Sequence, residues 1–493
     1  MAEDNSKEKV IPLKSSDLEE EFNKNIAIYG YKKDYSNSDE VKGAKETEKK
    51  LEETYRTNLR RQRDKILYTG GFRRLQDKTQ VMSATLSGDH RTRLTHTLEV
   101  EQIAISIANA LKLNVDLVSA IALGHDVGHT PFGHAAERKL NELLEDNGKF
   151  HHPIQSIRYI WEKYGSKIED VIYEGILLHD SDMFNIDKEE VKKQLKYLKE
   201  VEDEKEEFRS WVDLDKWLKE FPSTLEAQVV IWADKIAYIT HDLEDFLRSS
   251  IYINLQKNDD KIENKIYLIL NKIVKDLIKM KDFELRDLIR NIINNLIETS
   301  AENILKISDF TQEKVKKETK NRSEKDENKN KNENKRRIYL NSLIINLSDE
   351  YRQNYYELRE FLDRYYIFSP EVQKSDVKAE IIVETLFNTL KSNYKLMPLD
   401  IRDDIDKAIE NELKTNDNDD FKKIYDKFEK LKSIAQIEKY IEECKDEDVS
   451  KKYYTIKDKI ISRKVAAYIA TMTDTYAESM YRDLIGSRID FIL

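Results

Sequence analysis

The chain contains very little cysteine, proline or glycine. Its 493 residues include one cysteine, six prolines and twelve glycines. The one cysteine, Cys444, lies in the polar stretch EECKDED. A single cysteine excludes a framework of internal disulfides and is typical of a reducing compartment. The scarcity of proline and glycine favours long helices over many turns. We therefore predict an all-α protein.

Long hydrophobic runs and an excess of positive charge are also missing. The opening MAEDNSKEKV is charged throughout, and no apolar run reaches the roughly 18 residues of a membrane span. We therefore expect a cytoplasmic protein with no membrane partner. The formal net charge of −11 argues against a protein that coats nucleic acid through a basic surface. Single-stranded nucleic acid is thus at most a weak partner, and an anionic ligand must be bound locally.

The pattern along the chain predicts four segments. A polar N-terminal extension covers residues 1–50, and a catalytic core of buried helices covers residues 51–250. A further helical region, 251–455, contains the low-complexity stretch 314–337. This stretch is too polar to bury anything, so we predict a mobile loop there. A C-terminal helical segment, 456–493, is expected to return to the core.

Two apolar helices are expected to carry polar side chains into the core. Asn114 is predicted to cap a helix through LVSAIALGHD, which is almost wholly apolar until His125 and Asp126. Further along, Ser223 stands three residues before Glu226, which is the pattern of a capping box. It predicts a helix through EAQVVIWADKIAYITHDLEDFL. Helical spacing places four polar residues of that helix on one face: Asp234, Tyr238, Asp242 and Asp245.

The dipeptide His-Asp occurs three times, at residues 125, 179 and 241, and we expect one of the three to be the centre of a metal site. A divalent ion held by imidazole and carboxylate groups needs about four protein ligands from different segments. His125 and Asp126 supply two, His96 can pack beside them, and Asp234 can complete the set. The dipeptide at His179 has no comparable cluster in the neighbouring sequence.

The stretch GHDVGHTPFGHAAE, residues 124–137, contains further histidines beyond the ligand pair. His129 and His134 suit a phosphate chain, one to bind charge and the other to transfer a proton. Glu137 follows His134 by three residues, so a helix there would let the carboxylate orient the imidazole. The alternative is that either histidine only caps a helix.

Several blocks, in order, resemble a known family. They are RRQRDKILYTGGFRRLQDKTQV, GDHRTRLTHTLEVEQIA, GHDVGHTPFGHAAE, ADKIAYITHDLED and TMTDTYA. The chain thereby resembles the HD-domain dNTP triphosphohydrolases, especially the bacterial dGTPases. The resemblance implies an HD-domain helical core with additional helices. It also implies hydrolysis of a deoxynucleoside triphosphate, most of all dGTP, to the deoxynucleoside and inorganic triphosphate. A homo-oligomer, hexameric or tetrameric, is implied as well.

The resemblance also implies roles for individual residues. A divalent metal ion (Mn, Mg, Co, Fe or Ni) would be bound by His96, His125, Asp126 and Asp234. His134, supported by Glu137, would carry out proton transfer, while Arg93, His129 and Lys235 would hold the phosphates. Gln80 and Asp242 would bind the sugar 3′-hydroxyl, and the ring of Tyr238 would pack on the sugar. Asp474 and Tyr476 are weak candidates for the far wall of the base pocket.

Two other classes of function remain open from the sequence. One is an HD phosphohydrolase of another kind, acting on a nucleotide monophosphate, a cyclic dinucleotide or an alarmone. The sugar residues Gln80, Tyr238 and Asp242 would then have no use. The other is a non-enzymatic nucleotide-sensing or single-strand-binding scaffold with a vestigial site, against which the full ligand set and His134 both argue.

Overall fold

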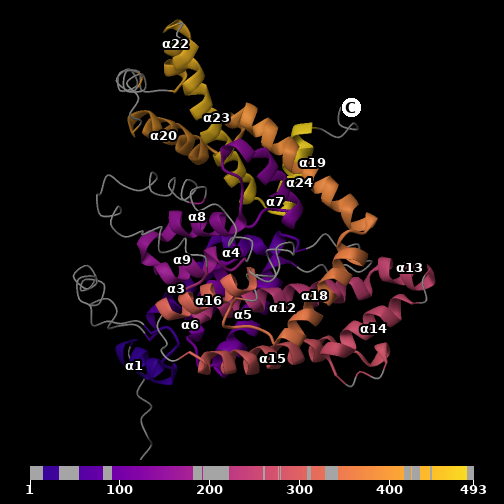
Figure 1. Cartoon of the computed structure of the whole chain (residues 1–493). Coiled ribbons are helices and arrows are strands. Elements are labelled where there is room, and N and C mark those ends of the chain that lie inside the picture. Colours follow the sequence, from indigo (N-terminus) through magenta and orange to yellow (C-terminus); the bar gives the residue numbers. More distant parts are fainter. Residues whose placement is uncertain are drawn as a thin grey trace, which may run out of the picture.

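The structure is a computed structural model of the chain (Figure 1). It describes residues 15–32, 55–80, 92–180, 221–258, 261–275, 279–307, 312–327, 342–415, 434–444 and 447–485, together with residues 191, 277 and 424. The described residues are almost entirely helical and contain no β-strand, only one isolated bridge between Thr79 and Thr92. The predicted all-α fold is confirmed.

The helices of the first half surround the predicted catalytic residues. Their bounds are α1 Ser15–Asn25, α3 Asn58–Leu67, α4 Gly70–Arg74, η1 Leu75–Asp77, α5 Arg93–Ala110, α6 Val115–Gly124, α7 Gly133–Leu143, η2 Glu145–Asn147, α8 His152–Tyr164, η3 Gly165–Lys167, α9 Asp170–Leu177, α12 Leu225–Arg248 and α13 Ser250–Asn258.

The second half of the chain adds further helices on two sides of these elements (Figure 1). Their bounds are α14 Ile262–Ile273, η6 Met280–Asp282, α15 Leu285–Leu305, α16 Gln312–Glu327, α18 Asp349–Leu362, the π-helical turn η7 Asp363–Ile367, α19 Pro370–Ser392, η8 Tyr394–Leu396, α20 Leu399–Thr415, α22 Ile434–Cys444, α23 Glu447–Ala470 and α24 Asp474–Ile485.

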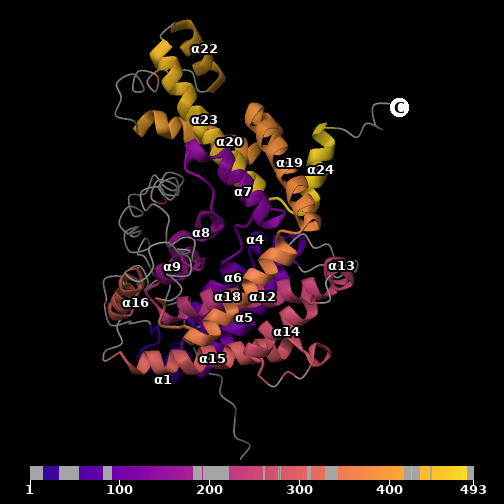
Figure 2. The ribbon, with the colours of Figure 1, turned by 45° about the vertical axis from the view of Figure 1, so that its right-hand side comes forward.

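The described residues form two separate hydrophobic cores. The first is built on α5, α6 and α12, which pack on one another, with α3, α8, α9, α14, α15 and α18 around them. The second joins α7 to α19, α20, α22, α23 and α24. Figures 1 and 2 show α7 among the orange and yellow helices of the C-terminal part, away from α5 and α12. One helix of the GHDVGHTPFGHAAE region therefore belongs to the C-terminal core.

Local capping explains where the central helices begin. The side chain of Asn114 accepts a hydrogen bond from the backbone N–H of Leu117, which confirms the predicted cap of α6. The predicted capping box before α12 is wrong. Thr224 caps that helix, and Glu226 instead accepts backbone N–H groups from Tyr31 and Asn114. Glu226 is fully buried, and these two distant donors offset the cost of desolvating its carboxylate.

The prediction of a loop over 314–337 is wrong for its first part. Residues 312–327 form α16, because Val315 and Thr319, one helical turn apart, are buried against the first core. Lys316 also forms an ion pair with the buried Glu174 of α9. These three contacts anchor an otherwise polar helix. Residues 328–341 lie outside the described residues.

The described part of the predicted N-terminal extension contacts the first core. It comprises α1 and the turn that follows, and the side chain of Ile26 is buried there. The Tyr31 hydroxyl donates to Glu169. In the described part of the chain, no helix is both long enough and apolar enough to cross a membrane.

Candidate metal centre and catalytic cluster

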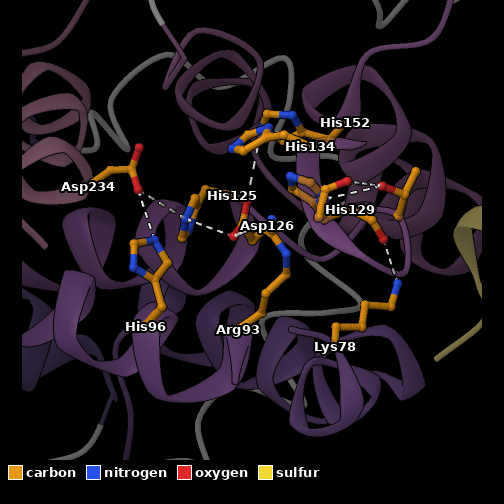
Figure 3. Close-up of polar contacts among 12 residues, drawn as sticks. Lys78, Arg93, His96, His125, Asp126, His129, His134, His152 and Asp234 are labelled. Carbon is orange, nitrogen blue, oxygen red and sulfur yellow. Dashed lines mark hydrogen bonds and ion pairs between the residues drawn. The ribbon is translucent and has the colours of Figure 1, made fainter. Parts of the chain in front are cut away.

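Three helices bring the four predicted metal ligands together (Figure 3). His96 lies in the first turn of α5, His125 and Asp126 follow the last residue of α6, and Asp234 lies on α12. Asp234 Oδ1 is 2.9 Å from His96 Nε2 and 3.8 Å from His125 Nε2. His125 Nε2 is 3.6 Å from Asp126 Oδ2. Ligand atoms of His96, His125 and Asp126 are close enough to share one ion.

The sequence around His125 explains why its imidazole faces this cluster. Helix α6 is apolar and buried along nearly its whole length, so its end is held inside the core. His125 Nδ1 lies 2.6 Å from the carbonyl oxygen of Ala122 and donates to it, which leaves Nε2 with the free lone pair. Gly128 is required just beyond, because a Cβ there would lie 2.1 Å from the backbone nitrogen of Ser156 on α8. His125 Nε2 is buried and has no hydrogen-bond partner among the described residues.

Arg93 contacts a predicted ligand. Its Nη1 donates to Asp126 Oδ2 at 2.7 Å, and both side chains are buried. Burial opposes ionisation of Asp126, but electrostatic interactions with His125 and Arg93 hold the pKa of its carboxyl well below the usual value. The remaining guanidinium nitrogens of Arg93, Nε and Nη2, are buried without a hydrogen-bond partner in the described part of the chain. The predicted phosphate contact thus stays a prediction, with two donors free for it.

His241 supports His96 from behind. The Nδ1 atoms of the two imidazoles are 3.4 Å apart, and His241 Nε2 is hydrogen-bonded to Glu99 of α5. The third His-Asp dipeptide therefore contributes its histidine to the surroundings of a predicted ligand. Sequence reasoning had connected its aspartate alone to the site.

The proton-transfer residues lie at the start of α7. Phe132 and Gly133 have φ values of 57° and 64°, and this left-handed turn directs the chain into the helix. The side chain of His134 is 44% exposed, and its Nδ1 is 3.4 Å from Glu137 Oε2. His129 is buried, with Nε2 3.6 Å from the same oxygen. Glu137 therefore lies between the two histidines, as the helical spacing predicted for His134.

His152, which sequence reasoning missed, forms the closest contact to Glu137. Its Nδ1 lies 2.9 Å from Glu137 Oε1, and its backbone N–H donates to the same oxygen. Burial opposes the charged form of His152, but the charge of Glu137 and this hydrogen bond prevail and raise its pKa to about 9. For Glu137, burial opposes ionisation, whereas the His152 charge and the His134 hydrogen bond lower its pKa.

His179 has no comparable cluster in its neighbouring sequence, but the fold brings it into contact with the predicted site. Its Nε2 is 3.2 Å from His152 Nε2, and its ring centroid is 4.9 Å from that of His125. His179 Nδ1 donates to the carbonyl of Ile176, three residues earlier, as His125 does to Ala122. Both histidines end an apolar helix, and that shared pattern was the available signal. Burial, followed by the charges of His125 and His152, lowers the pKa of His179 to about 4.

Seven imidazoles thus form one connected array. Neighbouring ring centroids are between 4.6 and 5.8 Å apart along the sequence of contacts His241, His96, His125, His179, His152, His129 and His134. Asp234 contacts His96 and His125 near one end of the array, and Glu137 contacts His152, His129 and His134 at the other end. The array therefore connects the predicted metal ligands to the predicted proton-transfer residues.

Two of the predicted sugar contacts, Tyr238 and Asp242, lie on α12 of the first core. Tyr238 and Asp242 follow Asp234 along α12, and Arg359 of α18 contacts both of them. Arg359 Nη1 is 2.8 Å from Asp242 Oδ2, and its guanidinium carbon is 4.6 Å from the centroid of the Tyr238 ring. Burial raises the pKa of Asp242 to about 7, against the opposing charge of Arg359. No sequence signal had singled out Arg359.

Gln80 lies near the first turn of α7, where its backbone carbonyl faces Gly133. Its side chain is buried, and Oε1 has no hydrogen-bond partner among the described residues. The pairing of Gln80 with Asp242 around a sugar hydroxyl remains a prediction. Lys235 is half-buried beside Asp234 on α12, and its phosphate contact also remains a prediction.

Asp474 is held by the protein itself. Its carboxylate accepts hydrogen bonds from the backbone N–H groups of Thr79 and Phe132 and from the Thr79 hydroxyl. We therefore interpret Asp474 as a structural link between the backbone at Thr79 and the backbone at Phe132, and not as part of the wall of a base pocket. The Tyr476 hydroxyl bonds to that of Tyr468.

The donor set fits a divalent cation. Two imidazoles and two carboxylates form a mixed nitrogen and oxygen set of the kind that binds first-row divalent metals. His125 Nε2 is buried and has no hydrogen-bond partner in the part of the chain that the structure describes, and this observation favours an ion, because an unsatisfied polar atom in the core is otherwise costly. The neighbouring N–H donors of Arg93 add a place for an anion beside it.

This fold and this His/Asp centre define an HD-domain phosphohydrolase. Residues 93–239 match the family model described as "HD domain", and residues 345–416 match a "Phosphohydrolase-associated domain". The first match contains all four predicted ligands.

Similar proteins extend the match over most of the chain. A "deoxyguanosinetriphosphate triphosphohydrolase-like protein" of Rickettsia bellii is 32% identical over 75% of this chain and 88% of that relative. Proteins of the same description from Rickettsia felis and Rickettsia typhi are each 32% identical to this chain. Each match covers 73% of this chain, together with 87% of the Rickettsia felis protein and 86% of the Rickettsia typhi protein. The chain belongs to the family of HD-domain dNTP triphosphohydrolases.

Proposed function

We propose that the protein hydrolyses a deoxynucleoside triphosphate, with dGTP as the expected substrate, to the deoxynucleoside and inorganic triphosphate. The observation that carries the proposal is the convergence of His96, His125, Asp126 and Asp234 beside His129, His134 and Glu137. The descriptions of the relatives support the choice of substrate.

His96, His125, Asp126 and Asp234 would hold the divalent cation, for which Mn²⁺, Mg²⁺, Co²⁺, Fe²⁺ and Ni²⁺ are candidates. When bound, such an ion acts as a Lewis acid toward water and the α-phosphate. Arg93 orients Asp126 through one guanidinium nitrogen and has two further donors for phosphate oxygens. His129, with its buried Nε2 free of hydrogen bonds among the described residues, and Lys235 would bind the rest of the phosphate chain.

His134 would supply the proton to the departing 5′-oxygen. His134 is the most exposed imidazole of the array. It can therefore reach a substrate while it contacts Glu137. Glu137 fixes the orientation of His134 and is itself held by His152. A positioned acid of this kind contributes about 10²- to 10⁴-fold to a rate.

Gln80, Tyr238 and Asp242 would distinguish deoxyribose from ribose. The Tyr238 ring contacts the guanidinium group of Arg359, and its centroid is 6.2 Å from that of His134, the proposed acid. A ring packed on the sugar at this position leaves no room for a 2′-hydroxyl. A homo-oligomer stays a prediction of the family resemblance, and single-stranded nucleic acid stays a prediction as at most a weak partner.

The test is a screen of the four dNTPs and four NTPs with Mn²⁺, Mg²⁺ or Co²⁺, with identification of every product. The proposal expects inorganic triphosphate and deoxynucleoside in equal amounts, fastest from dGTP, and poor turnover of ribonucleotides. Release of phosphate or pyrophosphate would refute the reaction and favour a phosphohydrolase acting on another nucleotide ester. Absence of turnover together with absence of a bindable divalent ion would favour the scaffold.

A further inference from the structure

The candidate active site is divided between the two hydrophobic cores. The helices that carry His96, His125 and Asp234 are α5, α6 and α12 of the first core. His134 and Glu137 lie on α7, whose buried face belongs to the second core through Ala135, Ala136 and Leu140 and packs on α19. Figures 1 and 2 both show α7 in the C-terminal part of the molecule. The distance between acid and metal centre therefore depends on how the two cores are joined.

Lys78 joins three segments at this boundary. Its ammonium group donates to the carbonyl oxygen of His129 at 2.5 Å and to that of Ala470, the last residue of α23, at 2.8 Å. Its own carbonyl accepts the backbone N–H of Arg93 at 2.8 Å, at the start of α5. The side chain is only 1% exposed. Figure 3 shows Lys78 below His129, on the opposite side of the cluster from Asp234.

Asp474 makes a second connection at the same place. One carboxylate oxygen accepts the N–H of Thr79 at 2.9 Å, and the other accepts the N–H of Phe132 at 2.8 Å. Phe132 precedes α7 and has the positive φ that sets the direction of the helix. An N–H at a helix start has no partner within the helix, so Asp474 fixes both the Phe132 backbone and the place where α7 begins.

We propose that Lys78 and Asp474 are positioning residues that together hold His134 and Glu137 in register with the metal centre. Neither side chain needs to touch the substrate. Lys78 ties the backbone next to the metal ligands to the end of α23, and Asp474 ties the start of α24 to the start of α7. The proposal rests on the proposed function for its kinetic consequence, but its structural consequence is independent of the reaction.

The kinetic test compares Asp474→Ala and Lys78→Met with the full-length wild type. Because a misplacement of about 1 Å can cost about 100-fold in rate, kcat is expected to fall by about 10- to 100-fold. The affinity for Mn²⁺, measured by calorimetric titration, should stay within about twofold, since all four ligands lie on the first core. Asp474→Asn keeps one carbonyl oxygen as an acceptor and should recover part of the lost kcat.

The matched control is Thr475→Ala. The Thr475 hydroxyl donates to Asp77 at 2.9 Å, so it links the same two segments one residue away, but on the exposed surface. This variant should keep the wild-type kcat. If Thr475→Ala lost as much kcat as Asp474→Ala, activity would depend equally on any contact between the two segments. That result would refute the specific role of Asp474.

Hydrogen–deuterium exchange separates the proposal from the proposed function. In Asp474→Ala, amides of residues 129–137 should exchange faster while those of residues 93–110 keep the wild-type rate. Unchanged exchange over 129–137, or Mn²⁺ affinity that falls in parallel with kcat, would overturn the positioning role. If the wild type hydrolysed no dNTP yet the exchange changed as expected, the proposed function would fail and the connection between the cores would stand.

Discussion

His96 and His241 face each other through their Nδ1 atoms, which are 3.4 Å apart. His96 Nε2 is directed at Asp234. If His96 held a metal ion through that nitrogen, the only ring proton of His96 would lie on Nδ1. This proton would then be donated to His241, which would donate its own proton from Nε2 to Glu99. Such an outer hydrogen bond fixes the orientation of a ligating histidine and raises its basicity.

Replacing His241 by leucine should therefore weaken metal binding. Loss of an outer-shell partner typically costs about 10- to 100-fold in metal affinity, and leucine keeps most of the buried volume. At saturating Mn²⁺ the variant should recover most of the wild-type kcat. The measurement is a Mn²⁺ titration of the metal-free protein. Affinity within about twofold of wild type would show that His241 is no more than a packing residue.

The predicted ligands Asp126 and Asp234 should respond differently to amidation. Asp234→Asn should release the metal and abolish turnover with little loss of stability, because its side chain is 24% exposed. Asp126→Asn should also leave the charge of Arg93 buried and unpaired, at a cost of about 3 kcal/mol in the free energy of unfolding. Elemental analysis and denaturant unfolding measure the two effects. Normal metal content in either variant would contradict the ligand assignment.

Glu137→Gln should lower kcat and leave the metal in place. The carboxylate contacts His134, His129 and His152, so its loss removes the partner that orients the proposed acid. We expect a fall of about 100-fold in kcat, within the usual range for acid catalysis. Metal content measured on the same sample provides the control. A variant with wild-type kcat would exclude His134 and Glu137 as a functional pair.

Tyr238→Ala should relax the preference for deoxyribose. The Tyr238 ring lies against Arg359 and is the proposed barrier to a 2′-hydroxyl. The ratio of kcat/KM for dGTP to that for GTP should fall by at least about tenfold, mainly through faster GTP turnover. An unchanged ratio would remove Tyr238 from the sugar pocket. Phenylalanine at this position should retain the discrimination, since the ring and not the hydroxyl is the barrier.

Residues next to one another in the sequence were the easiest to predict. Local pattern predicts the helix Val115–Gly124, its cap, and the pair His125 and Asp126 at its end. An apolar helix is buried in the core, so the polar residues at its end must find partners there. The relation of His134 to Glu137 follows from helical spacing.

Contacts set by packing between distant helices were not predictable in this way. His152 and Arg359 reach the cluster only through the placement of α8 and α18, and no periodicity in their own segments marks them. His179 carried a usable signal, an apolar run ending in His-Asp, but its distance from His125 in the sequence concealed their contact. The predicted capping box at Ser223 does not form, because the carboxylate of the buried Glu226 accepts hydrogen bonds from Tyr31 and Asn114 in other segments.

The most direct test of the central claim, hydrolysis at the phosphorus nearest the metal centre, is a single turnover of dGTP in H₂¹⁸O. Attack of water on the α-phosphorus with departure of the 5′-oxygen predicts one ¹⁸O atom in the released inorganic triphosphate and none in deoxyguanosine. Mass spectrometry of both products measures this. Label in the nucleoside, or label in phosphate or pyrophosphate in place of triphosphate, would contradict the account.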